Sequence, residues 1–165
     1  MVYLDTGCLV KLYYPEPDSG LVIDRVAGQE IVYTPLHALE LTTALELKRF
    51  RQEATLEQIA SSLASVQEDV SSGKLVVIDA PALDSLNAAT DLARMHAAET
   101  GCRALDALHC AWAKNLQISE FLSTDVRQLA LARLIGLRIV ELRNWPAKPA
   151  SSASKAKNTS SKTAT

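Results

Sequence analysis

The sequence predicts a single α/β domain in which a parallel β-sheet lies between two layers of helices. The 165 residues are enough for one sizeable core but too few for two. Hydrophobic residues make up 48% of the chain and aromatic residues only 5%, so aliphatic side chains must fill that core. Short strand-like runs alternate with longer helix-like runs, and parallel strands require such helical crossovers. These observations together predict a three-layer α/β sandwich.

Five short apolar runs predict the strands of the sheet. They are composed mainly of aliphatic, β-branched and aromatic residues and are bounded by turn or helix signals. The first run is closed by Asp5, Thr6 and Gly7, and the fourth ends in a second polar group that includes Asp125. The predicted strands cover residues 2–4, 30–33, 75–78, 121–122 and 137–142.

Capping residues, prolines and glycines set the bounds of the predicted helices. Pro35 suits the first turn of one helix, and Thr55 with Gln58 forms a capping-box pattern for the next. Gly73 and Gly101 mark two helix ends. The predicted helices span residues 9–14, 20–26, 36–50, 56–72, 81–100, 104–116 and 126–135. Residues three or four apart are expected to form the main buried stripe of the helix over 104–116, namely Leu105, Leu108, Trp112 and Leu116.

Charge and composition divide the chain into a folded domain over 1–146 and a tail over 147–165. The tail is rich in Ser, Ala, Lys and Thr without apolar periodicity, which predicts disorder. Subtracting its four lysines from the 17 basic residues leaves 13 basic and 19 acidic side chains in the domain, a net charge of −6. An acidic domain argues against nonspecific nucleic-acid binding through a basic surface, but not against a nuclease whose metal ions neutralise its site.

The cysteines and the hydropathy pattern favour a cytoplasmic protein. Cys8, Cys102 and Cys110 form no CxxC pair and match no zinc-finger spacing, so buried thiols are preferred over disulfides or zinc ligands. No run of 18 apolar residues predicts a membrane span, and no basic segment precedes the first apolar stretch as in a signal peptide.

Four carboxylates stand in apolar surroundings, namely Asp5, Glu40, Asp106 and Asp125. Asp5 and Asp125 follow predicted strands, and ligands of open α/β sheets gather at the carboxyl ends of strands. Helix capping explains either aspartate equally well when it is taken alone. Asp106 near the start of its helix also suits the helix dipole, although its face continues through small residues that allow another element to approach.

Glu40 is the hardest of the four to explain as a surface residue. Leu36, Ala44 and Leu47 lie on the same predicted helix face, so the carboxylate interrupts an apolar stripe. Glu46 has Arg49 three residues later, whereas Glu40 has only His37 within one turn. Four carboxylates converging on one crevice could not all stay ionised unaided, and a divalent cation would resolve their repulsion. Ligation by oxygen alone favours Mg²⁺ or Mn²⁺ over zinc.

Four segments carry a resemblance to a known family. The run VYLDTGCLVKLY, the acid in HALELTTALE, the helix RALDALHCAWA and the segment FLSTDVRQLALA together resemble a PIN domain, most closely the VapC-like toxin ribonucleases. The resemblance spans about residues 2–142 and implies a PIN-like, Rossmann-like fold. One departure is Gly7, where many relatives carry Ser, which would cost a supporting hydrogen bond without removing a metal ligand.

The resemblance implies an endoribonuclease that depends on Mg²⁺ or Mn²⁺, with Asp5, Glu40, Asp106 and Asp125 as direct or water-mediated metal ligands. The ion would activate a water for in-line attack on an RNA phosphodiester. The resemblance also implies a cognate antitoxin that holds the toxin inactive, and a homodimer. A non-catalytic PIN-like module for protein interaction is the alternative, in which the acids serve only as caps and surface charges.

Several neighbours of the four acids have two possible roles. Thr6 and Thr124 orient a carboxylate or water through their hydroxyls, or serve only in turns. Arg103 and Arg127 hold RNA phosphate, or pair with Asp106 and Asp125. His109 is predicted to be a core or supporting residue rather than a general base. A haloacid dehalogenase is disfavoured because Gly7 stands where its second Asp is required, and no Gly-rich phosphate loop is present.

Overall fold

The computed structural model describes residues 1–79, 82–118, 120–140 and 142, and its strands form one parallel sheet. The sheet has the order β3-β2-β1-β4-β5, with every neighbouring pair parallel. Its strands are β1 (Val2–Leu4), β2 (Ile31–Tyr33), β3 (Leu75–Val77), β4 (Glu120–Leu122) and β5 (Ile139–Val140). The prediction of a parallel α/β sandwich is therefore confirmed. The predicted tail over 147–165 lies outside the described residues, as does Pro81.

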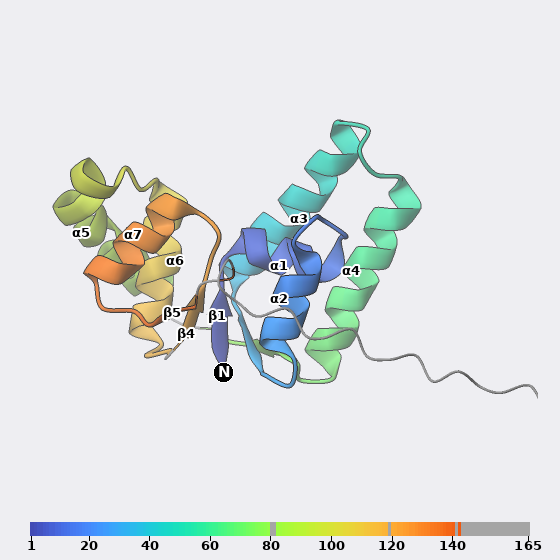
Figure 1. Cartoon of the computed structure of the whole chain (residues 1–165), viewed down its shortest axis with the longest axis horizontal. Helices are drawn as coiled ribbons and strands as arrows, with labels where there is room; N and C mark the ends of the chain where they lie inside the picture. Colours follow the sequence, from blue (N-terminus) through green and yellow to red (C-terminus); the bar gives the residue numbers. More distant parts are fainter. Residues whose placement is uncertain (80–81, 119, 141, 143–165) are drawn as a thin grey trace, which may run out of the picture.

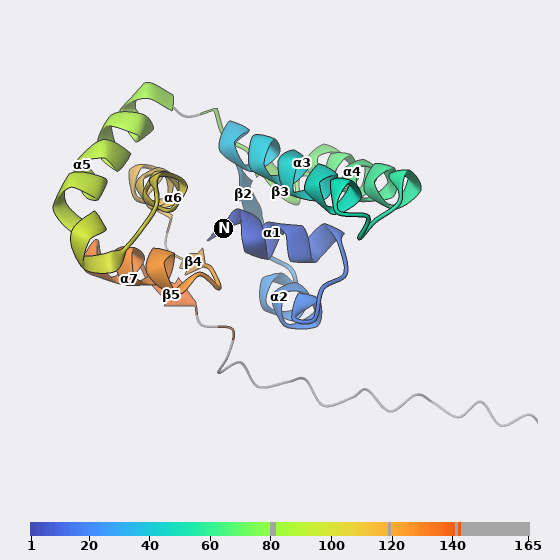
Figure 2. The same cartoon turned by 90° about the horizontal axis from the view of Figure 1, so that it is seen from above.

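The helices divide into two layers, one on each face of the sheet (Figure 1). The first layer contains α1 (Thr6–Tyr13), α2 (Ser19–Val26), α3 (Pro35–Phe50) and α4 (Leu56–Ser71). The second contains α5 (Ala82–Thr100), α6 (Ala104–Asn115) and α7 (Val126–Leu134). Seen from above, the two groups lie on opposite sides of β1 and β4 (Figure 2). Among the described residues, no helix combines the length and the apolar character that crossing a membrane requires.

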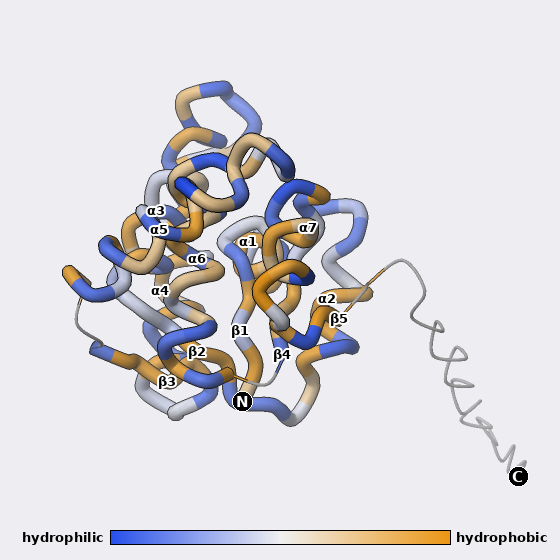
Figure 3. The backbone as a smooth tube through the Cα atoms, turned by 90° about the vertical axis from the view of Figure 1, so that its left-hand side faces the viewer, coloured by the Kyte–Doolittle hydropathy of each residue, from blue (hydrophilic) through white to orange (hydrophobic). Residues whose placement is uncertain are grey.

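Alternate residues of the strands supply the two cores. Val2 and Leu4 of β1 belong to the core under α1–α4, whereas Tyr3 between them belongs to the core under α5–α7. Ile31 and Val32 of β2 divide in the same way. The residues of β2 and β3 are mostly hydrophobic, as the orange colour of the tube in Figure 3 shows. Strands covered on both faces lack the polar alternation of a half-exposed sheet, which is why they read as short continuous apolar runs.

Most helix boundaries follow from the local signals in the sequence. Thr55 and Gln58 form the predicted capping box, and Pro35 occupies the first turn of α3. Gly73 and Gly101 end α4 and α5 with φ values of 79° and 67°, which other residues adopt at a cost. Three starts differ from prediction, and α3 begins only one residue early, at Pro35. Helix α1 begins at Thr6 because Asp5 caps it, and α2 begins at Ser19 rather than after it.

The predicted buried stripe of α6 is only partly correct. Trp112 is 3% exposed, and Leu108 and Leu116 are partly buried against the core under α5–α7. Leu105 is 47% exposed, while the small residues Ala107, Cys110, Ala111 and Ala113 are buried. Helix α6 lies against the sheet and is also packed by α5 and α7, so it is enclosed on several sides (Figure 2). The small side chains allow this close approach.

His37 joins α3 to β1 inside the protein. Its Nδ1 accepts the backbone N–H of Thr34 at 3.1 Å, so its Nε2 carries the proton and donates to the Leu4 carbonyl oxygen at 2.8 Å. Burial, and then the proximity of His109, lower the pKa of His37 from 6.5 to about 3. His37 is therefore neutral at physiological pH and completes the capping box of α3 with Thr34.

We expect Leu45→Ala to lower the free energy of unfolding by about 2–5 kcal/mol, because a buried leucine would leave a cavity. Leu45 is fully buried in the core under α1–α4. Leu39→Ala on the same helix is the matched control, since Leu39 is 67% exposed, and should change stability by no more than about 0.5 kcal/mol. Urea unfolding measures both values. Equal losses in the two variants would contradict this assignment of the core face of α3.

We expect His37 to make the protein less stable as the pH falls. Because its folded pKa of about 3 lies below the unfolded value of 6.5, its contribution is complete above pH 6.5 and is lost progressively toward pH 3. His37→Gln keeps a capping-box partner for Thr34 without titrating. Urea midpoints measured between about pH 7 and pH 5 should fall more steeply for the unsubstituted protein. Parallel curves for the two proteins would refute this, and His96→Gln on α5 serves as the control.

Candidate functional site

A cleft of about 410 Å³ opens at the carboxyl ends of β1 and β4. The chain leaves β1 toward β2 through the first helical layer, whereas β4 leads to β5 through the second, so the strand order reverses between β1 and β4. A crevice at this point of an open α/β sheet is the usual place for a ligand. All four predicted carboxylates line it. The complete lining is Asp5, Thr6, Gly7, Glu40, Leu105, Asp106, His109, Thr124, Asp125 and Gln128.

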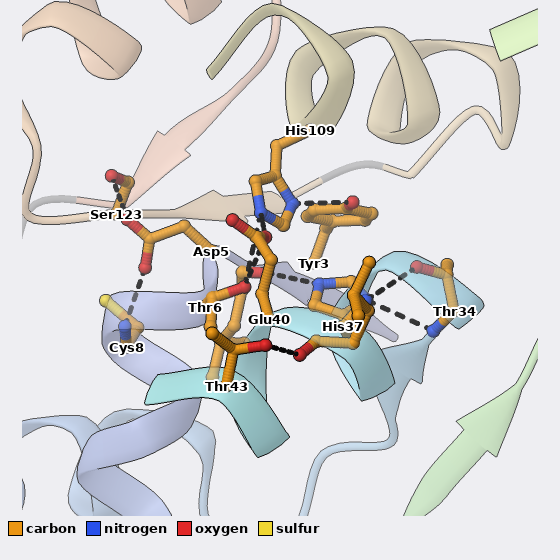
Figure 4. A network of polar contacts seen from close by, with 12 residues as sticks. Tyr3, Asp5, Thr6, Cys8, Thr34, His37, Glu40, Thr43, His109 and Ser123 are labelled. Atoms are coloured by element: carbon orange, nitrogen blue, oxygen red, sulfur yellow. Dashed lines mark hydrogen bonds and ion pairs between the residues drawn. The ribbon is translucent and has the colours of Figure 1, made fainter. Parts of the chain in front are cut away.

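Asp5 is buried at the end of β1 and is held by two donors. Its Oδ1 accepts the backbone N–H of Cys8 at 2.6 Å, which caps α1, and its Oδ2 accepts the hydroxyl of Ser123. The Ser123 hydroxyl oxygen also accepts the backbone N–H of Asp125 at 3.0 Å. Ser123 therefore connects the two strand-end aspartates (Figure 4 shows its contact with Asp5). Sequence reasoning did not identify Ser123 as a site residue.

Glu40 is held by a polar network that joins both helical layers. Its Oε2 accepts the hydroxyl of Thr6 at 2.7 Å and lies 2.6 Å from Nε2 of His109 (Figure 4). On the other side of the same ring, Nδ1 of His109 lies 2.9 Å from the hydroxyl of Tyr3. Residues of β1, α1, α3 and α6 thus belong to one network around this carboxylate. The Thr6 hydroxyl contacts a carboxylate, which is the contact that one of its two predicted roles requires.

The network determines the charge of Glu40. Burial by itself would raise the pKa of Glu40, but the hydrogen bond and charge of His109, with the Thr6 hydroxyl, lower it overall. Crowding of carboxylates suggested that at least one of them is difficult to ionise, and Glu40 shows the opposite shift. Burial raises the pKa of Tyr3, so its phenol stays neutral beside Nδ1 of His109.

The stripe predicted around Glu40 is only partly correct. Leu36 is nearly buried, but Leu47 is 41% exposed, and the buried face of α3 runs through His37, Leu41 and Leu45. Glu40 lies about 100° from Leu41 at 100° per residue, and so at the edge of the core rather than in its centre. This position lets the carboxylate reach His109 of the opposite layer.

Asp106 and Asp125 both cap helices and line the cleft. Asp106 Oδ2 accepts the backbone N–H of Arg103 at 2.8 Å at the start of α6. Asp125 Oδ1 accepts the N–H groups of Arg127 and Gln128 at 2.8 Å and 3.3 Å at the start of α7. The capping explanation therefore holds for Asp125, and Asp106 lies in the first turn of α6, as its helix-dipole explanation requires. Neither explanation excludes a further role, because a cap occupies one oxygen and leaves the other available.

The flanking residues divide between their alternative roles. Arg127 pairs loosely with Asp125, with 3.8 Å between Nε and Oδ1, as one of its two interpretations proposed. Arg103 is exposed, and the described part of the chain shows no ion pair between its side chain and Asp106. Thr124 is exposed and lines the cleft. Gly7 also lines it, and a Cβ at this position would lie 3.5 Å from Asp5 Oδ1, which is an ordinary contact.

Two further residues line the cleft: sequence reasoning predicted His109 as a core or supporting residue and missed Gln128. His109 is 3% exposed and contacts Glu40, and its spacing of three residues from Asp106 was the only signal available. Gln128 is 2% exposed, lines the cleft, and has an Oε1 atom without a hydrogen-bond partner. A buried amide oxygen that lacks a partner is costly, and a ligand or water in the cleft would satisfy it. No pattern in the sequence distinguishes Gln128 from an ordinary helical glutamine.

The cleft offers oxygen ligands of the type that hard cations prefer. Glu40 Oε1, Asp106 Oδ1 and Asp125 Oδ2 accept no hydrogen bond from the residues that the structure describes. Within the same residues, no group of three or more His, Cys, Asp or Glu side chains is close enough to form a ready-made metal site. Mg²⁺ retains several waters and binds through one or two carboxylates, so it does not require such a compact group.

Comparison with known proteins identifies the family. A family model described as PIN domain matches residues 2–134, which is most of the chain and confirms the resemblance carried by the motifs. A chain in the crystal structure of FitAcB from Neisseria gonorrhoeae is similar, with a TM-score of 0.58 and 15% sequence identity over 88% of this chain and 100% of that chain. At that identity the likeness concerns the fold alone. Curated proteins provide no match. This chain belongs to the PIN domain family.

Proposed function

We propose that the chain is a metal-dependent endoribonuclease that hydrolyses RNA phosphodiester bonds, and that it is the VapC-like toxin of a toxin–antitoxin pair. One observation carries the proposal: Asp5, Glu40, Asp106 and Asp125, from four separate segments of the chain, line a single cleft at the carboxyl ends of β1 and β4. Capping alone explains each aspartate but gives no reason for all of them to face Glu40 across one cavity.

The composition of the cleft suits Mg²⁺ or Mn²⁺. Its lining includes four carboxylates and the unpartnered Gln128 Oε1, while no cysteine, lysine or arginine is among the described residues around it. Hard divalent cations prefer such oxygen ligands, and a cation would offset the mutual repulsion of the acids. Asp5, Glu40, Asp106 and Asp125 would hold the ion directly or through water, with Gln128 as a further oxygen donor.

The residues of the chain prepare the site for an anionic substrate. Ser123 and the Cys8 N–H fix Asp5, and Thr6 and His109 fix Glu40, so neither carboxylate must be reoriented before the reaction. When bound, the ion supplies a positive charge that activates water and stabilises the charge developing on phosphate. Arg103 and Arg127 lie beside the capping acids and would contact phosphate at the rim of the cleft.

The proposed toxin would act in the cytoplasm and would be inhibited by a cognate antitoxin. The homodimer that the family resemblance implies would need apolar surface, and exposed leucines and a phenylalanine provide it. Phe50 is 82% exposed at the end of α3, and Leu56 is 63% exposed at the start of α4. Sedimentation of the purified protein at micromolar concentration tests the dimer, which a single monomeric species would contradict.

Asp5→Asn should reduce RNA cleavage in the presence of Mg²⁺ or Mn²⁺ by about 100-fold or more, because an amide replaces the charge of a ligand. Asn caps a helix about as well as Asp, so α1 should keep its start and the protein its fold. The matched control is Asp91→Asn on α5, whose side chain is 61% exposed and pairs with Arg94. Equal cleavage by Asp5→Asn and the unsubstituted protein would remove the basis of the ribonuclease assignment.

A non-catalytic PIN-like interaction module is the second candidate function. It is favoured by the lack of any ready-made group of three metal-binding side chains among the described residues. In this case the acids would act only as caps and as partners of His109.

Calorimetric titration with Mn²⁺ separates the two functions. A nuclease should bind the ion, and Glu40→Gln should weaken binding by about 10–100-fold, since the amide retains the shape of the side chain but loses its charge. Glu46→Gln on the same helix is the control, because Glu46 pairs with Arg49 on the surface. An unsubstituted protein that binds no Mn²⁺ would favour the interaction module.

A further inference from the structure

A second cavity lies between α1 and α3 and adjoins the carboxylate cleft. Its volume is about 300 Å³, and Gly7 lines both cavities, so the two adjoin at this residue. Its basic lining residues are Lys11 of α1, Lys48 of α3 and Arg51 directly after α3. We call this cavity the basic groove. Glu16 is the one acidic residue among the described residues that line it.

The spacing along α3 aligns the basic groove with the cleft. Glu40 is followed on the same side of the helix by Ala44, Lys48 and Arg51, at intervals of four, four and three residues. At 1.5 Å per residue, Lys48 lies about 12 Å and Arg51 about 16 Å from Glu40 along the helix axis. Lys11 of α1 faces this stripe across the groove. The positive charges therefore form a line that leads away from the four carboxylates.

Ion pairs hold the two lysines in place and leave an excess of positive charge. Glu16 accepts Nζ of Lys11 at 2.8 Å and Nζ of Lys48 at 2.6 Å, and the Lys48 ammonium lies 4.6 Å from the centre of the Tyr14 ring. One carboxylate thus faces two ammonium groups. The guanidinium of Arg51 forms no ion pair with the part of the chain that the structure describes, and Arg51 is exposed. With Arg51 included, the groove carries a net charge of about +2, in a domain whose net charge is negative.

An RNA strand would explain why an acidic cavity and a basic cavity adjoin. The carboxylates of the cleft repel phosphate wherever a cation does not intervene, so an RNA strand needs favourable contacts beside the cleft to remain bound. Lys11 and Lys48 are already immobilised by Glu16, which lowers the entropy cost of contacting a phosphate. Arg51 has a free planar guanidinium, which can bind phosphate through two hydrogen bonds.

We infer that the basic groove binds backbone phosphates of a single-stranded RNA segment that extends from the cleft along α1 and α3. This inference rests on the proposed ribonuclease function. The distance between the basic groove and the carboxylates of the cleft corresponds to a few nucleotides. The groove therefore contacts the strand on one side of the scissile bond. The contacts are with the backbone, and the groove supplies affinity and direction rather than recognition of bases.

RNA binding by the full-length protein in the Asp5→Asn background tests this inference. The probe is a fluorescent single-stranded oligoribonucleotide without divalent ions, and its affinity is measured by anisotropy at several salt concentrations. Each phosphate contact of a single strand contributes about −0.7 to the slope of log K against log salt. Arg51→Gln should make the slope less negative by about 0.7 and weaken binding severalfold at low salt. Arg51→Lys should leave the slope as it is with Arg51, because it retains the positive charge.

Arg49→Gln is the matched control for Arg51→Gln. Arg49 lies about 160° around α3 from Arg51 and pairs with Glu46, so its loss should leave the slope unchanged. An equal change of slope in both variants, or no change in Arg51→Gln, would overturn the groove while leaving the ribonuclease proposal intact. If the unsubstituted protein neither binds nor cleaves RNA, the proposed function fails and the groove fails with it.

Discussion

The reversal of strand order between β1 and β4 is the constraint on which the site depends. Parallel strands must be joined by helical crossovers, so the chain before β3 covers one face of the sheet and the chain after it covers the other. The two layers separate above the ends of β1 and β4, and the cleft lies there. Asp5 and Asp125 reach the cleft because they directly follow these strands.

The carboxylates of the cleft combine structural and proposed chemical roles. A buried carboxylate is costly unless hydrogen bonds compensate for the loss of water. Each of the four acids has at least one such bond, from backbone N–H groups at helix starts or from the hydroxyls and imidazole around Glu40. These bonds keep the acids in place before any cation binds. These bonds and the proposed metal binding are compatible, because one oxygen each of Glu40, Asp106 and Asp125 accepts no hydrogen bond from the described residues.

The basic groove adds a charge distribution that the net charge of the domain conceals. Lys11, Glu16 and Lys48 come from α1, the following loop and α3, and become neighbours only when α1 packs on α3. The composition argued against a broadly basic surface, and the basic groove is a local excess of positive charge within one cavity. A nuclease with an acidic site has a physical need for such a local arrangement, because the substrate must be attracted without filling the cleft with side-chain cations.

The sequence by itself determined the fold class, the order and approximate bounds of most elements, and the four acids that line the cleft. These features depend on local signals: apolar period, capping residues, glycines, and acids placed after strands. Only the tertiary structure decided the partners of those acids and the burial of α6. Tyr3, Glu40 and His109 are distant along the chain, as are Asp5 and Ser123. Their contacts arise because two helical layers meet across a sheet. No local sequence pattern indicates which residues distant along the chain will become neighbours.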